Sequence, residues 1–205
     1  MGKAIVILGA GTGGTIMANR LRKKFAADEA TITIVDENDQ HIYQPGLLFV
    51  PFGIYQPEDI IRPRGAQLRK GINYIQATIK ALDAQGKSVS LSDGQTISYD
   101  LLIIATGTSL LFEETEGLTG TGWRESIFDF YTLEGATALH EKLAAFEGGN
   151  VVVSLIDLPI KCPVAPLEFT FLADWYFTER GIRDKVKLTY VTSLDAVFTK
   201  PVAAE

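Results

Sequence analysis

The stretch Gly9-Ala10-Gly11-Thr12-Gly13-Gly14 decides the fold of this 205-residue chain. It follows Ala4–Leu8, a short and continuous apolar run that is typical of a buried parallel strand. It also opens a segment with helical periodicity that extends to Phe25. A second strand-like segment, Thr31–Val35, follows and ends in Asp36-Glu37. This order of strand, glycine turn, helix and strand predicts a Rossmann-type βαβ unit.

Each glycine of this turn has its own physical reason. Gly9 allows the tight turn after the strand, Gly11 lets the backbone approach a pyrophosphate, and Gly14 lets helix and strand pack closely. The amides at the helix N-terminus then face the phosphates, where the helix dipole favours negative charge. The carboxylate of Asp36 is expected to accept hydrogen bonds from a ribose and to repel a 2′-phosphate, which disfavours NADP.

A second motif favours FAD over NAD. The turn signal Asp93-Gly94 predicts a β-hairpin, which leads into the apolar strand Asp100–Ala105 and then into Thr106-Gly107. The segment Ser88–Gly107 resembles the second flavin-contact segment of the flavoproteins with two dinucleotide-binding domains, in which the Ala-Thr-Gly turn lies beside FAD. The resemblance implies FAD as the cofactor. The expected cofactor-binding residues are Gly9, Gly11, Thr12, Gly13, Gly14, Asp36, Glu37, Ala77, Ala105, Thr106 and Gly107.

The expected fold class is therefore α/β. We predict a Rossmann-like FAD-binding domain with a β-hairpin insertion over residues 1–115, and a second, degenerate Rossmann-like βαβ domain over residues 116–205. The helix of the first domain is expected to place Met17, Leu21 and Phe25 on one apolar face. The apolar loop His41–Tyr55 either packs against the core or forms a wall of a flavin or substrate pocket.

The second domain lacks the usual signature of a nicotinamide-binding site. Its strand Asn150–Ile156 is present, but no Gly-x-Gly occurs between Val151 and Glu179. The backbone there cannot easily approach a pyrophosphate, and prolines remove amide donors that would cradle it, namely Pro159, Pro163 and Pro166. NADH binding at this place is not expected.

Cys162, the only cysteine, stands where those glycines would be. Lys161 and the N-terminus of the helix expected from Pro166 both favour its thiolate, which could pass electrons to a flavin. The alternative is a small buried hydrophobic residue. Glu168, in the first turn of that helix, is either a proton acceptor or a carboxylate that complements the helix dipole, and both readings stay open.

The run Lys161–Glu168 resembles the Lys-Cys-Pro-Pro-Ala-Pro-Tyr-Glu type of segment in sulfide:quinone oxidoreductases and flavocytochrome c sulfide dehydrogenases. The resemblance implies FAD-dependent oxidation of sulfide to sulfane sulfur or polysulfide through Cys162, with quinone as the electron acceptor. Two features depart from the family. The second redox cysteine is absent, and Gly120–Tyr131 contains Ser126, Phe128 and Tyr131 where some members have an additional cysteine.

Members of that family are also much longer. We therefore interpret the chain as an N-terminal portion of such an enzyme, with the quinone site and any peripheral membrane contact in the part that follows. Two other readings remain open: a type II NADH:quinone dehydrogenase-like flavoenzyme, and a non-catalytic FAD-binding module.

Composition excludes several other classes. The net charge of −6 and the isoelectric point near 5.0 argue against nucleic acid as a partner. We find no signal peptide and no apolar run long enough to span a membrane, so the expected location is cytoplasmic or peripheral to a membrane. His41 and His140 have no metal-ligand partners at useful spacing, so no metal site is expected, and His140 is expected at the surface. A homo-oligomer is compatible with this composition.

Overall fold

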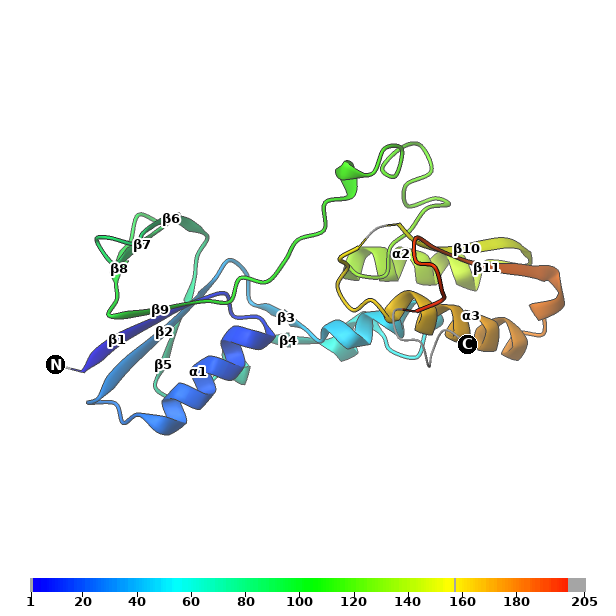
Figure 1. Cartoon of the computed structure of the whole chain (residues 1–205). Coiled ribbons are helices and arrows are strands. Elements are labelled where there is room, and N and C mark those ends of the chain that lie inside the picture. Colours follow the sequence, from blue (N-terminus) through cyan, green and yellow to red (C-terminus); the bar gives the residue numbers. More distant parts are fainter. Residues whose placement is uncertain (1, 157, 199–205) are drawn as a thin grey trace. The chain divides into compact units, whose positions relative to one another are not determined.

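The structure is a computed structural model that describes residues 2–156 and 158–198. The chain forms two compact units. Unit 1 comprises Met1–Tyr43 and Ile60–Glu114, and unit 2 comprises Gln44–Asp59 and Thr115–Glu205 (Figure 1). Each unit contains parallel strands connected through a helix, which confirms the α/β class. Asp157 and residues 199–205 of the predicted second domain lie outside the described residues.

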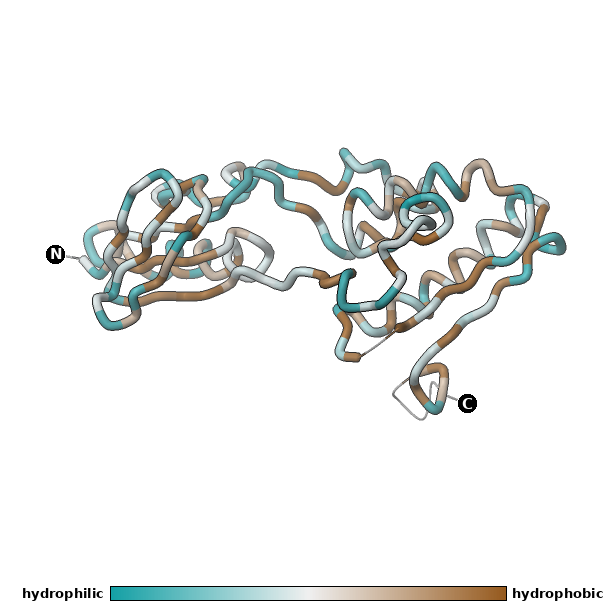
Figure 2. Tube along the Cα trace, turned by 90° about the horizontal axis from the view of Figure 1, so that it is seen from above, coloured by the Kyte–Doolittle hydropathy of each residue, from teal (hydrophilic) through white to brown (hydrophobic). Residues whose placement is uncertain are grey.

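A four-stranded parallel sheet forms the centre of unit 1, in the order β5-β2-β1-β9. Ile5, Ile7, Ile32 and Ile34 build its core and are at most 4% exposed. Figure 2 shows the hydrophobic runs along these strands, with hydrophilic residues in the loops. The sheet and its crossover helix comprise β1 (Lys3–Leu8), α1 (Thr12–Lys24), β2 (Ala30–Asp36), β5 (Ile72–Gln76) and β9 (Leu101–Ile104).

Unit 1 also contains short antiparallel strands outside this sheet. The predicted hairpin insertion is a three-stranded sheet in the order β6-β7-β8, and a separate pair joins β3 to β4. Their bounds are β3 (Gln40–Ile42), β4 (Ile61–Pro63), β6 (Ile79–Asp83), β7 (Ser88–Leu91) and β8 (Thr96–Ser98).

The packed face of α1 differs from the expected one. Leu21 and Phe25 pack against the core as expected, but Met17 is 39% exposed. The buried residues of the helix are Gly14, Thr15 and Ala18. Small side chains let the helix lie close to the sheet, so they occupy the face that the apolar periodicity assigned to larger residues.

Unit 2 contains a β-α-β crossover. Strands β10 (Gly149–Leu155) and β11 (Val186–Thr192) pair in parallel, and α3 (Ala165–Glu179) connects them. A second helix, α2 (Leu133–Ala144), precedes this crossover and begins at the N-cap Thr132, whose hydroxyl accepts a hydrogen bond from the amide of Gly135 at 3.0 Å. The buried core includes Phe52, Leu143, Phe169 and Phe177.

The apolar loop after His41 belongs partly to unit 2. Residues 44–59 contain 3₁₀ helices at Gln44–Leu48 and Val50–Phe52 and most of a third, Pro57–Ile60, which ends one residue past the unit boundary. They cluster with unit 2, where apolar side chains of the segment such as Leu48 and Phe52 belong to the core or pack against it. The sequence had placed this whole segment within residues 1–115, and no periodic pattern distinguishes it from the strands on either side.

His140 is less exposed than the expected surface position would make it. It is partly buried on α2, and its Nδ1 lies 3.2 Å from the carbonyl oxygen of Pro51. This contact holds the 44–59 segment on α2. Its place beside Leu139 on an amphipathic helix had predicted contact with solvent, but the imidazole contacts a backbone carbonyl instead.

Candidate functional site

The glycine turn at the end of β1 has the geometry of a nucleotide-binding loop. Gly9 has a φ of +92°, and a Cβ there would lie 2.3 Å from the carbonyl oxygen of Ala105. A Cβ at Gly14 would lie 1.8 Å from the carbonyl oxygen of Gly9, whereas one at Gly11 would meet nothing within 4 Å. The fold itself thus requires Gly9 and Gly14, while Gly11 borders open space, as the approach of a pyrophosphate would require.

The other predicted cofactor residues lie at this same edge of the sheet. Three backbone amides here donate to backbone carbonyl oxygens: Gly9 to Val35 at 2.8 Å, Ala105 to Leu8 at 2.7 Å, and Ala77 to Asp36 at 2.9 Å. Thr12 and Gly13 are exposed in the first turn of α1, and Glu37, Thr106 and Gly107 are exposed just after their strands. The structure therefore brings together the residues expected to hold the cofactor, namely Gly9, Gly11, Thr12, Gly13, Gly14, Asp36, Glu37, Ala77, Ala105, Thr106 and Gly107.

Asp36 itself is engaged within the protein. Its Oδ2 accepts a hydrogen bond from the amide of Ala10 at 2.6 Å, and its Oδ1 lies 3.3 Å from Nε of Arg64. Both side chains of this ion pair are only 12% exposed. The next carboxylate, that of Glu37, is exposed. The expected ribose acceptor therefore also has an internal role, as an anchor of the turn.

Three side chains contact the carbonyl oxygen of Ala10. Nη1 of Arg64 donates to it at 2.7 Å and Oγ1 of Thr15 at 3.0 Å, and Nδ1 of His41 lies 3.4 Å away. Sequence reasoning missed Arg64, because it lies 54 positions from Ala10 and belongs to no motif. Since both backbone groups of Ala10 are hydrogen-bonded to protein groups, the protein itself holds the glycine turn.

Two ionisable groups of unit 1 have shifted pKa values for local reasons. Burial, with the charges of Asp39 and Asp36, raises the pKa of Tyr74, whose hydroxyl donates to the carbonyl of Asn38 at 2.8 Å. The amide of Ala4 donates to Asp100 at 2.8 Å and lowers the pKa of that carboxyl. Both groups form hydrogen bonds with backbone groups of unit 1, and neither is among the residues expected to hold the cofactor.

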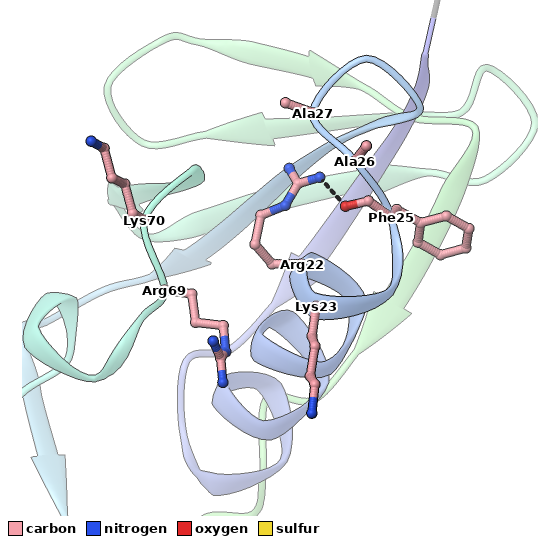
Figure 3. A pocket seen from close by; sticks show the side chains of 7 residues that line it. All are labelled: Arg22, Lys23, Phe25, Ala26, Ala27, Arg69 and Lys70. Atoms are coloured by element: carbon pink, nitrogen blue, oxygen red, sulfur yellow. Dashed lines mark hydrogen bonds between the residues drawn. The ribbon is translucent and has the colours of Figure 1, made fainter.

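A separate cavity of about 370 Å³ opens at the far end of α1 (Figure 3). Its lining includes the cations Lys23, Arg69 and Lys70. The guanidinium of Arg22 donates to the carbonyl of Phe25 and, at 3.1 Å, to that of Ala30, so it closes the end of the helix. The 13-residue helix is roughly 20 Å long, which separates this cavity from the glycine turn.

In unit 2, Cys162 lies between β10 and α3 and is exposed. This excludes its reading as a small buried hydrophobic residue. Its backbone has a φ of +46°, in the left-handed region. Its carbonyl oxygen accepts hydrogen bonds from the hydroxyl of Tyr131 at 3.1 Å and from the amide of Ala165 at 3.0 Å.

Lys161, which was expected to favour the Cys162 thiolate, has a different polar neighbour in the structure. Nζ of Lys161 lies 3.4 Å from Oε1 of Gln44, so this amine is directed to an amide oxygen. Glu168 is exposed in the first turn of α3. Burial, and then the nearby Cys162, Tyr190 and Glu168, raise the pKa of Tyr131. Tyr131, Cys162, Tyr190 and Glu168 are therefore close enough to interact electrostatically. The sequence did not predict this grouping.

Comparison with known proteins shows which family and which relatives this chain is similar to. The family model of the pyridine nucleotide-disulphide oxidoreductases matches residues 3–153. A mitochondrial sulfide:quinone oxidoreductase of Dictyostelium discoideum is 29% identical over 195 residues, which are 95% of this chain and 43% of that protein. The X-ray structure of the sulfide:quinone oxidoreductase from Aquifex aeolicus superposes with a TM-score of 0.79 at 27% identity, over 95% of this chain and 44% of that one.

The chain thus spans less than half the length of these relatives. A type II NADH:quinone oxidoreductase of Staphylococcus aureus is 30% identical, but over only 119 residues, or 58% of this chain and 29% of that protein. The similarity to sulfide:quinone oxidoreductases therefore covers a larger share of this chain. The predicted resemblance to this group of flavoproteins is confirmed. Within the part of the chain that the structure describes, no helix is both long and apolar enough to span a bilayer.

Proposed function

We propose that this chain, which belongs to the pyridine nucleotide-disulphide oxidoreductase family, oxidises sulfide to sulfane sulfur or polysulfide. In this proposal FAD is the cofactor and the electrons pass to a quinone. FAD is the cofactor of this group of flavoproteins. One observation supports the sulfide assignment above all others. An exposed cysteine, Cys162, follows β10 where a nicotinamide-binding loop would have glycines.

The residues of unit 1 fit FAD. The open space beside Gly11 and the amides that begin α1 suit a pyrophosphate. The exposed carboxylate of Glu37 is free to accept hydrogen bonds from ribose hydroxyls, while Asp36 holds the turn. When bound, FAD supplies a two-electron acceptor.

Cys162 supplies the sulfur chemistry. Its thiolate and one hydrosulfide become a cysteine persulfide, one proton and two electrons, so that one S–S bond forms and one S–H bond breaks. Bound FAD would supply the acceptor for these two electrons, with a quinone as the proposed final acceptor. The exposed carboxylate of Glu168 is the proposed acceptor of the proton. The sulfane sulfur then remains on Cys162 until a second nucleophile removes it.

The match to a type II NADH:quinone oxidoreductase favours a second candidate, NADH as the reductant. The proline-rich loop argues against it, because Pro163 and Pro166 have no amide hydrogen to offer a pyrophosphate. A third candidate is a module that binds FAD without turnover, and the single cysteine favours it.

The anaerobic visible spectrum of the FAD-loaded protein tests all three. Bleaching by sulfide in the wild type, its loss in Cys162→Ser and the absence of bleaching by NADH are expected. Bleaching by NADH alone would move the assignment to NADH oxidation. A bound-flavin spectrum that neither reductant changes would reduce the chain to an FAD-binding module.

A further inference from the structure

The backbone of Cys162 has a conformation that residues with a side chain rarely adopt. Its φ of +46° lies in the left-handed region, where the Cβ crowds the following carbonyl group. Such a conformation persists only when its surroundings hold it. Here the carbonyl oxygen of Cys162 is held twice, by the Tyr131 hydroxyl at 3.1 Å and by the Ala165 amide at 3.0 Å.

Only one of these two bonds comes from outside the loop. The Ala165 amide belongs to the turn that starts α3, three residues after Cys162, so it moves with that turn. Tyr131 lies 31 positions earlier in the chain, just before α2. Its hydroxyl therefore ties the cysteine to a separate part of unit 2.

Tyr131 is itself well anchored. Oδ1 of Asp129 accepts hydrogen bonds from the amides of Tyr131 at 2.9 Å and Thr132 at 2.7 Å. Its other oxygen, Oδ2, pairs with Arg124 at 2.7 Å, and the two side chains of this pair are 10% and 19% exposed. The preceding ring, that of Phe130, stacks on Phe169 of α3 with centroids 4.6 Å apart. The residues on either side of Tyr131 are thus fixed both to their own segment and to α3.

The hydroxyl of Tyr131 remains a donor at ordinary pH. Burial, and then the charges of Cys162, Tyr190 and Glu168, raise its pKa. A phenol with a raised pKa keeps its hydrogen at ordinary pH, so the hydrogen bond to the Cys162 carbonyl is retained.

From this geometry we infer that Tyr131 is the positioning residue of the cysteine loop: its hydroxyl fixes the carbonyl of Cys162 and so holds the thiol in place ahead of α3. The role in turnover rests on the proposed function of Cys162. In the sequence, the segment Gly120–Tyr131 was notable only because it lacks a cysteine that some members of the resembling family have. The structure gives this segment a contact of its own with the reactive residue.

Hydrogen exchange of the FAD-loaded protein tests the contact directly. In Tyr131→Phe, which keeps the ring, amide exchange over residues 158–166 should become about fivefold faster, as the loss of one hydrogen bond predicts. Tyr55→Phe is the matched control, because Tyr55 is a 39% exposed tyrosine of the same unit. This control should not change the exchange.

Sulfide-dependent flavin bleaching separates positioning from general stability. The limiting rate should fall about fivefold in Tyr131→Phe, with the half-saturating sulfide concentration and the thermal midpoint unchanged. Unchanged exchange over 158–166 in a folded Tyr131→Phe protein overturns the inference. If Tyr131→Phe does not fold, the exchange of these amides in the wild type decides. Protection that is no greater than in an unstructured peptide also overturns the inference. Faster exchange in a protein that sulfide does not bleach supports the contact and rejects the proposed function.

Discussion

Asp36 and Ala10 are joined by a hydrogen bond of 2.6 Å from the Ala10 amide to the carboxylate. The acid that ends β2 therefore holds the glycine turn from inside the protein. Arg64 completes the arrangement, because it contacts both the Asp36 carboxylate and the Ala10 carbonyl. Since the two oxygens of Asp36 are engaged, Glu37 is the nearer free acceptor for a ribose.

Substitution of these two carboxylates should separate stability from cofactor binding. Asp36→Ala leaves Arg64 and the Ala10 amide without their acid, and we expect a loss of about 3 kcal/mol in the free energy of unfolding. Glu37→Ala is the matched control in an exposed position. It should change stability by less than about 0.5 kcal/mol and weaken FAD binding roughly tenfold. Urea unfolding and flavin fluorescence titration measure the two effects. Equal stability losses, or FAD affinity unaffected by Glu37→Ala, would contradict this division.

Two glycines of the turn should respond to alanine in opposite ways. At Gly14 the added methyl would lie 1.8 Å from the carbonyl oxygen of Gly9, so Gly14→Ala should cost about 3 kcal/mol or more of stability. At Gly11 a methyl meets no atom within 4 Å, so Gly11→Ala should fold with a loss of at most about 1 kcal/mol. It should nevertheless bind FAD much more weakly, because the methyl occupies the path of the pyrophosphate. Thermal unfolding and fluorescence titration of both variants provide the check, and full FAD affinity in Gly11→Ala would remove the pyrophosphate from that place.

The local elements could be predicted from sequence because their signals are local. The apolar run Ala4–Leu8, the glycine turn and the helix that follows each depend on residues adjacent in the chain. The same holds for the hairpin at Asp93-Gly94, since a two-residue signal decides its turn. These predictions needed no knowledge of tertiary packing.

The features that sequence did not predict depend on long-range contacts. Arg64 reaches Ala10 across 54 positions, and Tyr131 reaches Cys162 across 31. Segment 44–59 packs with unit 2 through apolar residues whose spacing follows no regular period. Periodicity cannot identify such partners, because any arginine, tyrosine or apolar loop of suitable length would give the same local pattern.

The raised pKa of Tyr131 predicts how unit 2 responds to alkali. The ordinary pKa of tyrosine is 10.0, and in the folded protein that of Tyr131 lies above it. Above about pH 10 the unfolded chain loses this proton more readily than the folded one, so stability falls as pH rises. The free energy of unfolding should therefore decline more steeply in the wild type than in Tyr131→Phe. Urea unfolding between about pH 9 and about pH 11 measures the slopes. Tyr55→Phe should follow the wild type, and parallel slopes for all three proteins would contradict the shift.

The left-handed backbone of Cys162 predicts a conflict between stability and chemistry. Glycine adopts a φ of +46° without steric cost, so Cys162→Gly should raise the free energy of unfolding by about 0.5–1 kcal/mol after its greater chain entropy is counted. Cys162→Ala is the matched variant: it also lacks the thiol but keeps the Cβ, and we expect no gain from it. Both variants should lose flavin bleaching by sulfide, so only the backbone distinguishes them. Urea unfolding decides the point. A glycine variant no more stable than the alanine variant would show that the cysteine is not strained, whereas a difference between them would mean that the fold accepts an unfavourable backbone at the residue proposed to carry the sulfur chemistry.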